Sequence, residues 1–169
     1  MLKLIRKATS VINEAVLTVK ALKALNERLN PTTKEVVSRV NGIPVVVSSE
    51  ALEIKYNVPE QYPGAMVTQK IKGSHYIIIN QGMVDLPADI YDAILQHEVG
   101  HIECKHLSGA LAIYKNLRHG RNINYEFEAD LYSQRTTGNM LKALEYLKSL
   151  KIYNNLELDL RIDMLRKAA

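Results

Sequence analysis

Cysteine is almost absent from the chain, which contains only Cys104 and no Cys-x-x-Cys pair. A single cysteine cannot form a disulfide within the chain, and it cannot supply a thiolate cage for zinc or a redox pair. A reducing compartment is therefore the simpler location. We expect a cytoplasmic protein.

Long apolar runs and blocks of like charge are also missing. The apolar stretches are short, as at residues 77–79, whereas about 18 apolar residues in a row are needed to cross a bilayer. The basic N-terminus is followed by Ser10, Asn13 and Glu14, where a signal peptide has an unbroken apolar segment. The net charge of +4 is spread along the chain. We therefore expect no signal peptide, no membrane anchor and no specific nucleic-acid partner.

The apolar residues that are present suffice for one core. The chain has 169 residues, of which 47% are hydrophobic and 24% are charged. A chain of this length buries roughly 70% of the surface that it exposes when unfolded. We therefore expect a single domain that spans residues 1–169.

The pattern of apolar residues predicts helices at both ends of the chain and strands in the middle. The β-branched stretches at 43–49, 65–71 and 74–80 are typical of strands, and Lys72-Gly73 predicts a tight turn between the last two. This order predicts an α+β fold with a small, mostly antiparallel three-stranded sheet. The expected regions are N-terminal helices at 2–40, the sheet region at 43–80, and helices at 86–107, 124–136 and 139–167.

The N-terminal helix has a role that the sequence does not define. Its apolar residues recur at spacings of three, four and seven over 2–29, so the helix needs a partner surface. It packs into the core of its own domain, makes a dimer contact, or covers the cleft as an inhibitory segment. The oligomeric state is left open for the same reason.

The helix expected at 86–107 carries the sequence His-Glu-Val-Gly-His at residues 97–101. Two histidines four residues apart lie about 40° apart around a helix and one turn apart along it, so His97 and His101 can hold one metal ion. Zinc suits two neutral imidazoles and an oxygen ligand, and it keeps a fourth position for water. Glu98 is placed to accept a proton from that water. The pattern predicts a hydrolytic site with one Zn²⁺ per chain.

The third protein ligand has several candidates. On a helix that continues to residue 107, His106 points about 140° away from His101, and no glycine between them turns the chain back. We therefore expect that His106 is not a ligand. Cys104 lies one turn beyond His101, and we interpret it as a small buried side chain that lines the pocket. Glu126 and Glu128 lie on a separate helix that can pack across the first, and the residues alone do not choose between them.

Several motifs occur together in the second half of the chain. They are the residues 97–101, His106 five positions later, Glu126-Phe127-Glu128-Ala129-Asp130, Tyr132, Thr137-Gly138-Asn139, Ala143-Leu144, and Arg161-Ile162 with Leu165. This set resembles the HtpX and CAAX prenyl protease family of gluzincin zinc endopeptidases. The resemblance covers roughly residues 74–165.

The resemblance implies a zincin-like, gluzincin-type fold in which the helix bearing the two histidines packs on the sheet. It implies a zinc-dependent metalloendopeptidase, a hydrolase whose partner is a protein or peptide substrate. Because the chain lacks long apolar runs, we expect a soluble version of such an enzyme. His97 and His101 are then zinc ligands, Glu98 is the general base, and Glu126 is the third ligand. Asp130 is implied to hold the far nitrogen of a ligand histidine.

The chain departs from the family pattern in two respects. Family members usually carry transmembrane helices around the catalytic domain, and none is expected here. The family also tends to place a His-Pro pair shortly before the Arg-Ile segment, where this chain has residues 153–155. The group that stabilises the oxyanion is therefore open among Tyr125, Tyr153, His119 and Arg161.

Arg161 is our first choice for the oxyanion, because a cation near the scissile carbonyl stabilises the charge that develops there. Its other interpretation is a salt bridge with Glu157, four residues earlier on the same helix. Glu128 is expected to face away from the zinc site.

The expected substrate lies extended along a sheet edge beside the zinc site, pairing through its backbone. We expect Ser74 to Asn80 to form that edge. The other interpretation of this segment is a core strand packed on both faces, which Ile77-Ile78-Ile79 supports equally well. At the level of function, the alternative is a zinc-binding regulatory or interaction domain with latent or no peptidase activity.

Overall fold

The computed structural model describes residues 34–56, 58–69, 74–106, 122–151 and 155–168. The helix expected at 2–29 lies outside these residues, and so does the tight turn expected at Lys72-Gly73. The prediction of a single domain over the whole chain therefore stays a prediction. The unit described below begins at Lys34.

Within the described residues, four strands form one sheet: β1 (Val36–Val40), β2 (Ile43–Val47), β3 (Ala65–Gln69) and β4 (His75–Ile79). Their order is β1-β2-β4-β3, with β2 and β4 parallel and the other two pairs antiparallel. The sheet is therefore mixed, which corrects the expectation of a mostly antiparallel sheet. The parallel pair arises because α2 (Ser49–Tyr56) and β3 come between β2 and β4, and such a crossover returns the chain in the same direction.

β1 stands where the sequence analysis expects a short helix that ends near Val40. Asn41 and Gly42 both have positive φ angles, 49° and 79°, as the two central residues of a type I′ hairpin turn require. An Asn-Gly pair is a strong hairpin signal, and the valines before it favour a strand. The prediction that the N-terminal helices extend to residue 40 is therefore wrong for residues 36–40.

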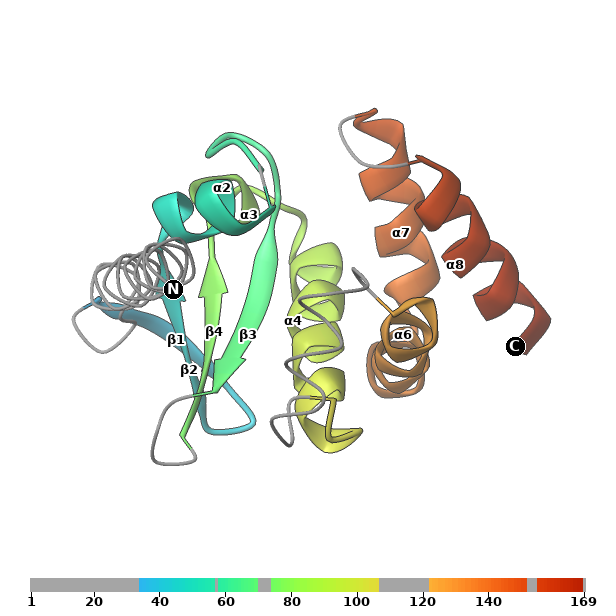
Figure 1. Ribbon diagram of the computed structural model, residues 1–169, viewed down its shortest axis with the longest axis horizontal. Coiled ribbons are helices and arrows are strands. Elements are labelled where there is room, and N and C mark those ends of the chain that lie inside the picture. Colours follow the sequence, from blue (N-terminus) through green and yellow to red (C-terminus); the bar gives the residue numbers. More distant parts are fainter. Residues whose placement is uncertain (1–33, 57, 70–73, 107–121, 152–154, 169) are drawn as a thin grey trace, which may run out of the picture. The chain divides into compact units, whose positions relative to one another are not determined.

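β4 lies inside the sheet, between β2 and β3. The expectation that residues 74–80 form the edge is therefore wrong. Ile77, Ile78 and Ile79 are at most 1% exposed, as the alternative interpretation of a core strand requires. Of the two edge strands, β1 and β3, β3 makes the more extensive contact with the long helix α4 (Ala88–Glu103) (Figure 1).

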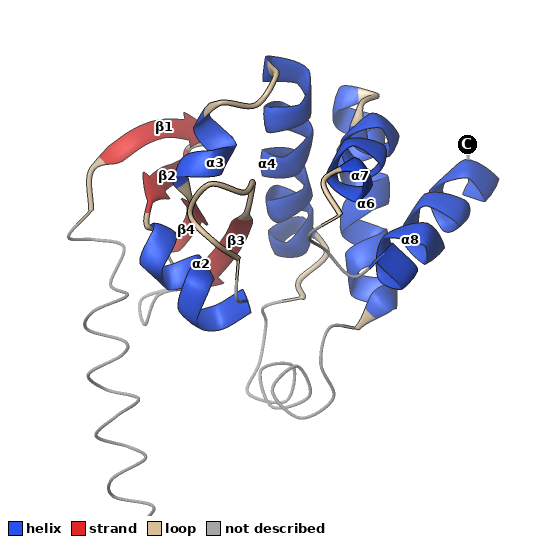
Figure 2. Ribbon diagram, turned by 90° about the horizontal axis from the view of Figure 1, so that it is seen from above, coloured by secondary structure: helices blue, strands red, loops and turns tan. Residues whose placement is uncertain are grey.

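Helices follow the sheet along the chain, and the fold is α+β. α4 lies within the range that the helical periodicity predicts, and α6 extends one residue beyond its predicted range at each end. α4 lies between the sheet and the C-terminal helices (Figures 1 and 2). Among the described residues, no helix is both long enough and apolar enough to cross a membrane. The further helices are α3 (Gln81–Val84), α6 (Ile123–Thr137), α7 (Met140–Ser149) and α8 (Asn155–Ala168).

The apolar core holds α4 in place against the sheet. Val45, Ile77 and Ile79 belong to one buried cluster with Ile94 and Val99 of α4. α7 and α8 contribute further buried side chains to the same cluster. Burial of this kind stabilises by roughly 1.5–3 kcal/mol for each large apolar side chain. It fixes α4 so that its other side meets α6.

Candidate metal centre

The candidate site begins with a close crossing of α4 and α6. A Cβ atom added to Gly100 would lie 2.9 Å from Cα of Ala129, so only glycine allows the two backbones to come this near. Ser133 on α6 donates a buried hydrogen bond of 2.6 Å to the carbonyl of Ala93 on α4. These contacts bring side chains of both helices to one point. His97 and His101 of α4 meet Glu126 of α6 there.

One atom from each of these three residues converges on a single location. The Nε2 atoms of His97 and His101 are 3.1 Å apart. Oε2 of Glu126 is 3.4 Å from Nε2 of His97, and Oε1 is 3.7 Å from Nε2 of His101. A tetrahedral zinc ion with ligands at about 2.0–2.2 Å keeps its ligand atoms roughly 3.3–3.6 Å apart. The spacing and the chemistry of the three donors therefore fit a zinc ion.

His97 is supported from behind by a carboxylate. Its Nδ1 lies 2.8 Å from Oδ1 of Asp130, which is fully buried. Burial lowers the pKa of His97, but the charge of Asp130 and contacts with Asp130 and Glu126 outweigh it and raise the pKa to about 9. Burial raises the pKa of Asp130, but Arg161 and His97 hold it below its usual value. Asp130 thus takes the place that the family resemblance implies.

Arg161 joins the acidic residues of the site. Its guanidinium donates two hydrogen bonds to Asp130, of 2.8 and 2.7 Å. It also lies 3.4 Å from Oε2 of Glu126 and 3.7 Å from Oε1 of Glu157. The salt bridge with Glu157 is thus present as one contact among several. The oxyanion role of Arg161 stays a prediction, and the geometry favours a positioning role.

His101 and Glu126 are held in the protonation states that a metal ligand needs. Burial, followed by the positive charge of His97, lowers the pKa of His101 to about 3, so its imidazole is neutral. Burial raises the pKa of Glu126, but His97 and Arg161 hold it well below its usual range. Glu126 is therefore a carboxylate. Metal ligation requires both states.

Glu98 and the remaining oxyanion candidates are placed differently. Glu98 lies in α4 beside His97 and is 7% exposed. Its role as general base stays a prediction. Tyr125 stacks on the ring of His106, with centroids 4.4 Å apart. His119 and Tyr153 lie outside the described residues.

His106 is a site residue whose position the sequence analysis missed. α4 ends at Glu103 rather than near residue 107, and Lys105 has a φ of 60°. This left-handed residue turns the chain back, so that the amide of His106 donates to the carbonyl of His101 at 2.9 Å. Glycine usually marks such a turn. Because the position holds lysine, the sequence offered no signal for it.

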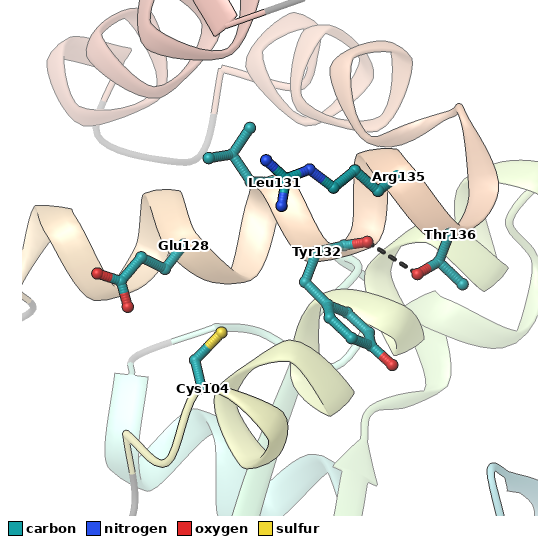
Figure 3. Close-up of a pocket in the computed structure, with 6 residues that line it drawn as sticks. All are labelled: Cys104, Glu128, Leu131, Tyr132, Arg135 and Thr136. Atoms are coloured by element: carbon teal, nitrogen blue, oxygen red, sulfur yellow. Dashed lines mark hydrogen bonds between the residues drawn. The ribbon is translucent and has the colours of Figure 1, made fainter.

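A second group of potential ligands lies next to the first. Cys104, His106 and Glu128 each offer a ligand atom, and these atoms lie within 4.8 Å of one another. Cys104 and Glu128 project into a pocket of about 430 Å³ between the end of α4 and α6 (Figure 3). Cys104 lines this pocket and is exposed, which corrects the expectation of a buried side chain. Partial burial, Glu128 and Glu103 raise the pKa of its thiol.

Comparison of the chain with protein-family models, curated proteins and solved structures finds no match. The resemblance to the gluzincin peptidases is therefore supported by the motifs alone.

Proposed function

We propose that the chain is a zinc-dependent metalloendopeptidase in which His97, His101 and Glu126 hold the ion. One observation carries the proposal: the Nε2 atoms of His97 and His101 lie 3.1 Å apart, and they lie 3.4 and 3.7 Å from the carboxylate oxygens of Glu126 on the second helix. Three protein ligands with a fourth position left for water are typical of catalytic zinc sites, whereas structural sites use four.

The donor set favours zinc among the common metal ions. Two imidazoles and one carboxylate suit zinc, whereas magnesium and calcium prefer oxygen ligands only. When bound, zinc lowers the pKa of water and polarises a carbonyl group. The cofactor in this proposal is one Zn²⁺ per chain.

The residues around the ligands transfer the proton and hold the ligands in position. Glu98 accepts a proton from the attacking water and returns it to the leaving amine. Asp130 holds the imidazole of His97 through Nδ1, and Arg161 holds Asp130 and Glu126. Arg161 then acts by fixing these two acids, not by contact with the substrate.

A gluzincin-type arrangement is part of the same proposal. In support of it, the helix that carries both histidines contacts the sheet, and the third ligand comes from the next described helix. Among the described strands, β3 pairs with β4 alone and so lies at an edge of the sheet, and it contacts α4 (Figure 1). An extended peptide can therefore add as a strand beside β3. The substrate class that follows is an unfolded or extended segment of a protein.

The variant Glu98→Gln tests the proposal most simply. The amide keeps the size of the side chain but cannot accept the proton, so cleavage of a peptide library should fall by about 10²-fold or more. Zinc content should stay at the wild-type value because Glu98 is not a ligand. The matched control is Glu103→Gln, an exposed position on the same helix, which should leave both quantities unchanged.

Two outcomes would contradict the proposal. Unchanged cleavage by zinc-loaded Glu98→Gln would remove Glu98 from the mechanism. Zinc-loaded wild-type protein that cleaves neither the library nor casein would favour the alternative, a zinc-binding regulatory or interaction domain.

A further inference from the structure

We propose that His106 and Glu128 position His101, as a hydrogen-bonded chain that fixes the tautomer of this ligand. The inference rests on the metal-binding part of the proposed function. It assigns a role to two residues that the proposed catalytic mechanism does not use.

The chain of contacts is continuous from the surface to the ligand. Nε2 of His106 is 2.9 Å from Oε2 of Glu128, and Nδ1 of His106 is 2.9 Å from Nδ1 of His101. The Glu128 carboxylate only accepts, so the proton between it and His106 belongs to Nε2. Nδ1 of a neutral His106 is then an acceptor, and Nδ1 of His101 must donate to it. The lone pair of His101 is left on Nε2, the atom that faces His97 and Glu126.

The ring of His106 is held firmly enough to act in this way. Its side chain is buried, although the carboxylate of Glu128 is about half exposed. Tyr125 stacks on one face with an interplanar angle of 12°, and the His101 ring packs against it at 5.1 Å. The backbone hydrogen bond to the carbonyl of His101 fixes the turn itself. An imidazole with so little freedom orients its partner at a low entropic cost.

The two histidine ligands thus have different supports. His97 contacts a fully buried carboxylate, Asp130, directly. On its Nδ1 side, His101 reaches a carboxylate through the imidazole of His106. Because Glu128 is exposed and its charge is screened by solvent, we expect the larger part of the effect to come from His106.

A second metal ion at Cys104, His106 and Glu128 is the competing interpretation of the same residues. An ion on Nε2 of His106 would require the ring proton to be on Nδ1. That proton would face the Nδ1 proton of His101 at a nitrogen separation of 2.9 Å. The positioning chain and a second ion therefore exclude each other, and a count of bound ions distinguishes them.

The test measures zinc affinity by competition with a chelator, together with the visible spectrum of the Co²⁺-substituted protein. His106→Phe keeps an aromatic ring beside Tyr125 but removes the acceptor, and should weaken zinc binding by about 10–100-fold. His106→Asn restores an oxygen near the position of Nδ1 and should stay within a few-fold of wild type. Glu128→Gln should lie between them, and Glu103→Gln is its control.

The outcomes separate this inference from the proposed function. Wild-type affinity and an unchanged Co²⁺ spectrum in His106→Phe would overturn it, as would two ions per chain with one lost in Cys104→Ser. If His106→Phe fails to fold, the zinc affinities of His106→Asn and Glu128→Gln decide. Weaker zinc binding in Glu128→Gln, with near wild-type binding in His106→Asn, supports the hydrogen-bonded chain. Unchanged zinc binding in Glu128→Gln overturns it. Zinc binding without peptide cleavage would overturn only the peptidase, whereas absence of zinc binding would overturn both.

Discussion

Arg161 is the residue that balances the buried negative charges behind the candidate ligands. Asp130 is fully buried, Arg161 is 6% exposed, and the two are joined by a pair of short hydrogen bonds. Removal of one partner of such a pair leaves the other charge uncompensated in a medium of low dielectric constant. The arginine is therefore needed for stability whether or not zinc is bound.

The variant Arg161→Met should lower the free energy of unfolding by about 3–5 kcal/mol, measured by urea denaturation of the metal-free protein. Arg166→Met is the matched control on the same helix. Arg166 forms a salt bridge with Glu145, but both side chains are about half exposed, so its loss should cost less than about 1 kcal/mol. Equal effects of the two substitutions would mean that Asp130 does not depend on Arg161.

His97 gives zinc binding a dependence on pH. Its pKa is raised to about 9 in the metal-free protein, so a proton must leave before the ion binds at neutral pH. Zinc affinity should therefore rise about tenfold for each pH unit from 7 to 9 and then level off. Calorimetry in buffers of different ionisation enthalpy should detect release of about one proton per zinc at pH 7. An affinity that does not change over this range would contradict the raised pKa.

The same raised pKa affects the stability of the metal-free protein. Protonated His97 gains its partners only in the folded state, so its contribution is fully present below the unfolded pKa of about 6.5. The contribution is lost as the pH rises through about 9. His101 acts in the opposite direction, because its pKa of about 3 makes the folded state less stable as the pH falls below about 6.5.

At the scale of elements, the crossing of α4 and α6 sets the distance between the histidines and Glu126. In Gly100→Ala the new Cβ would lie 2.9 Å from Cα of Ala129, so the helices must separate. Overpacking of this kind costs about 1–3 kcal/mol, although alanine is the better helix former by about 1 kcal/mol. We therefore expect a lower melting temperature and weaker zinc binding, measured by scanning calorimetry and chelator competition.

The control for this substitution is Asp92→Ala, at an exposed position of the same helix. It should leave zinc affinity unchanged. If Gly100→Ala instead raised the melting temperature at wild-type zinc affinity, helix propensity would outweigh the close contact and the crossing would not determine the site.

The helices that carry the candidate site were predicted from the sequence more accurately than the turns and strands around them. α4 and α6 have a clear apolar periodicity, and their bounds are within a few residues of those expected. The end of α4 was missed because a lysine occupies the left-handed position at residue 105. The role of His106 was missed for the same reason, since its direction depends on that turn.

At the scale of the whole described unit, strand order is the feature that local sequence did not determine. The β2–β4 parallel pair joins segments 32 residues apart in register, such as Val45 and Ile77, and no local signal specifies such a pairing. β4 lies inside the sheet because it pairs with β2 in this way as well as with β3. By contrast, the buried run at residues 77–79 already allowed a strand packed on both faces.

The candidate site also links three parts of this unit. α4 supplies the histidines, α6 supplies Glu126 and Asp130, and α8 supplies Arg161. Because the ion would bind only when these helices are folded together, its binding would stabilise all three against unfolding. We therefore expect one ion to be held at the α4–α6 crossing.

The most direct test is the number of zinc ions retained per chain after dialysis, measured by elemental analysis. The account predicts one zinc ion in the wild type and in Cys104→Ser, and less than one in Glu126→Gln at the same free zinc concentration. Glu126→Gln removes the charge of the third ligand at constant size, whereas Cys104→Ser leaves His97, His101 and Glu126 unchanged. Zinc retained in Glu126→Gln but lost in Cys104→Ser would place the ion at the second group of ligands and contradict the account.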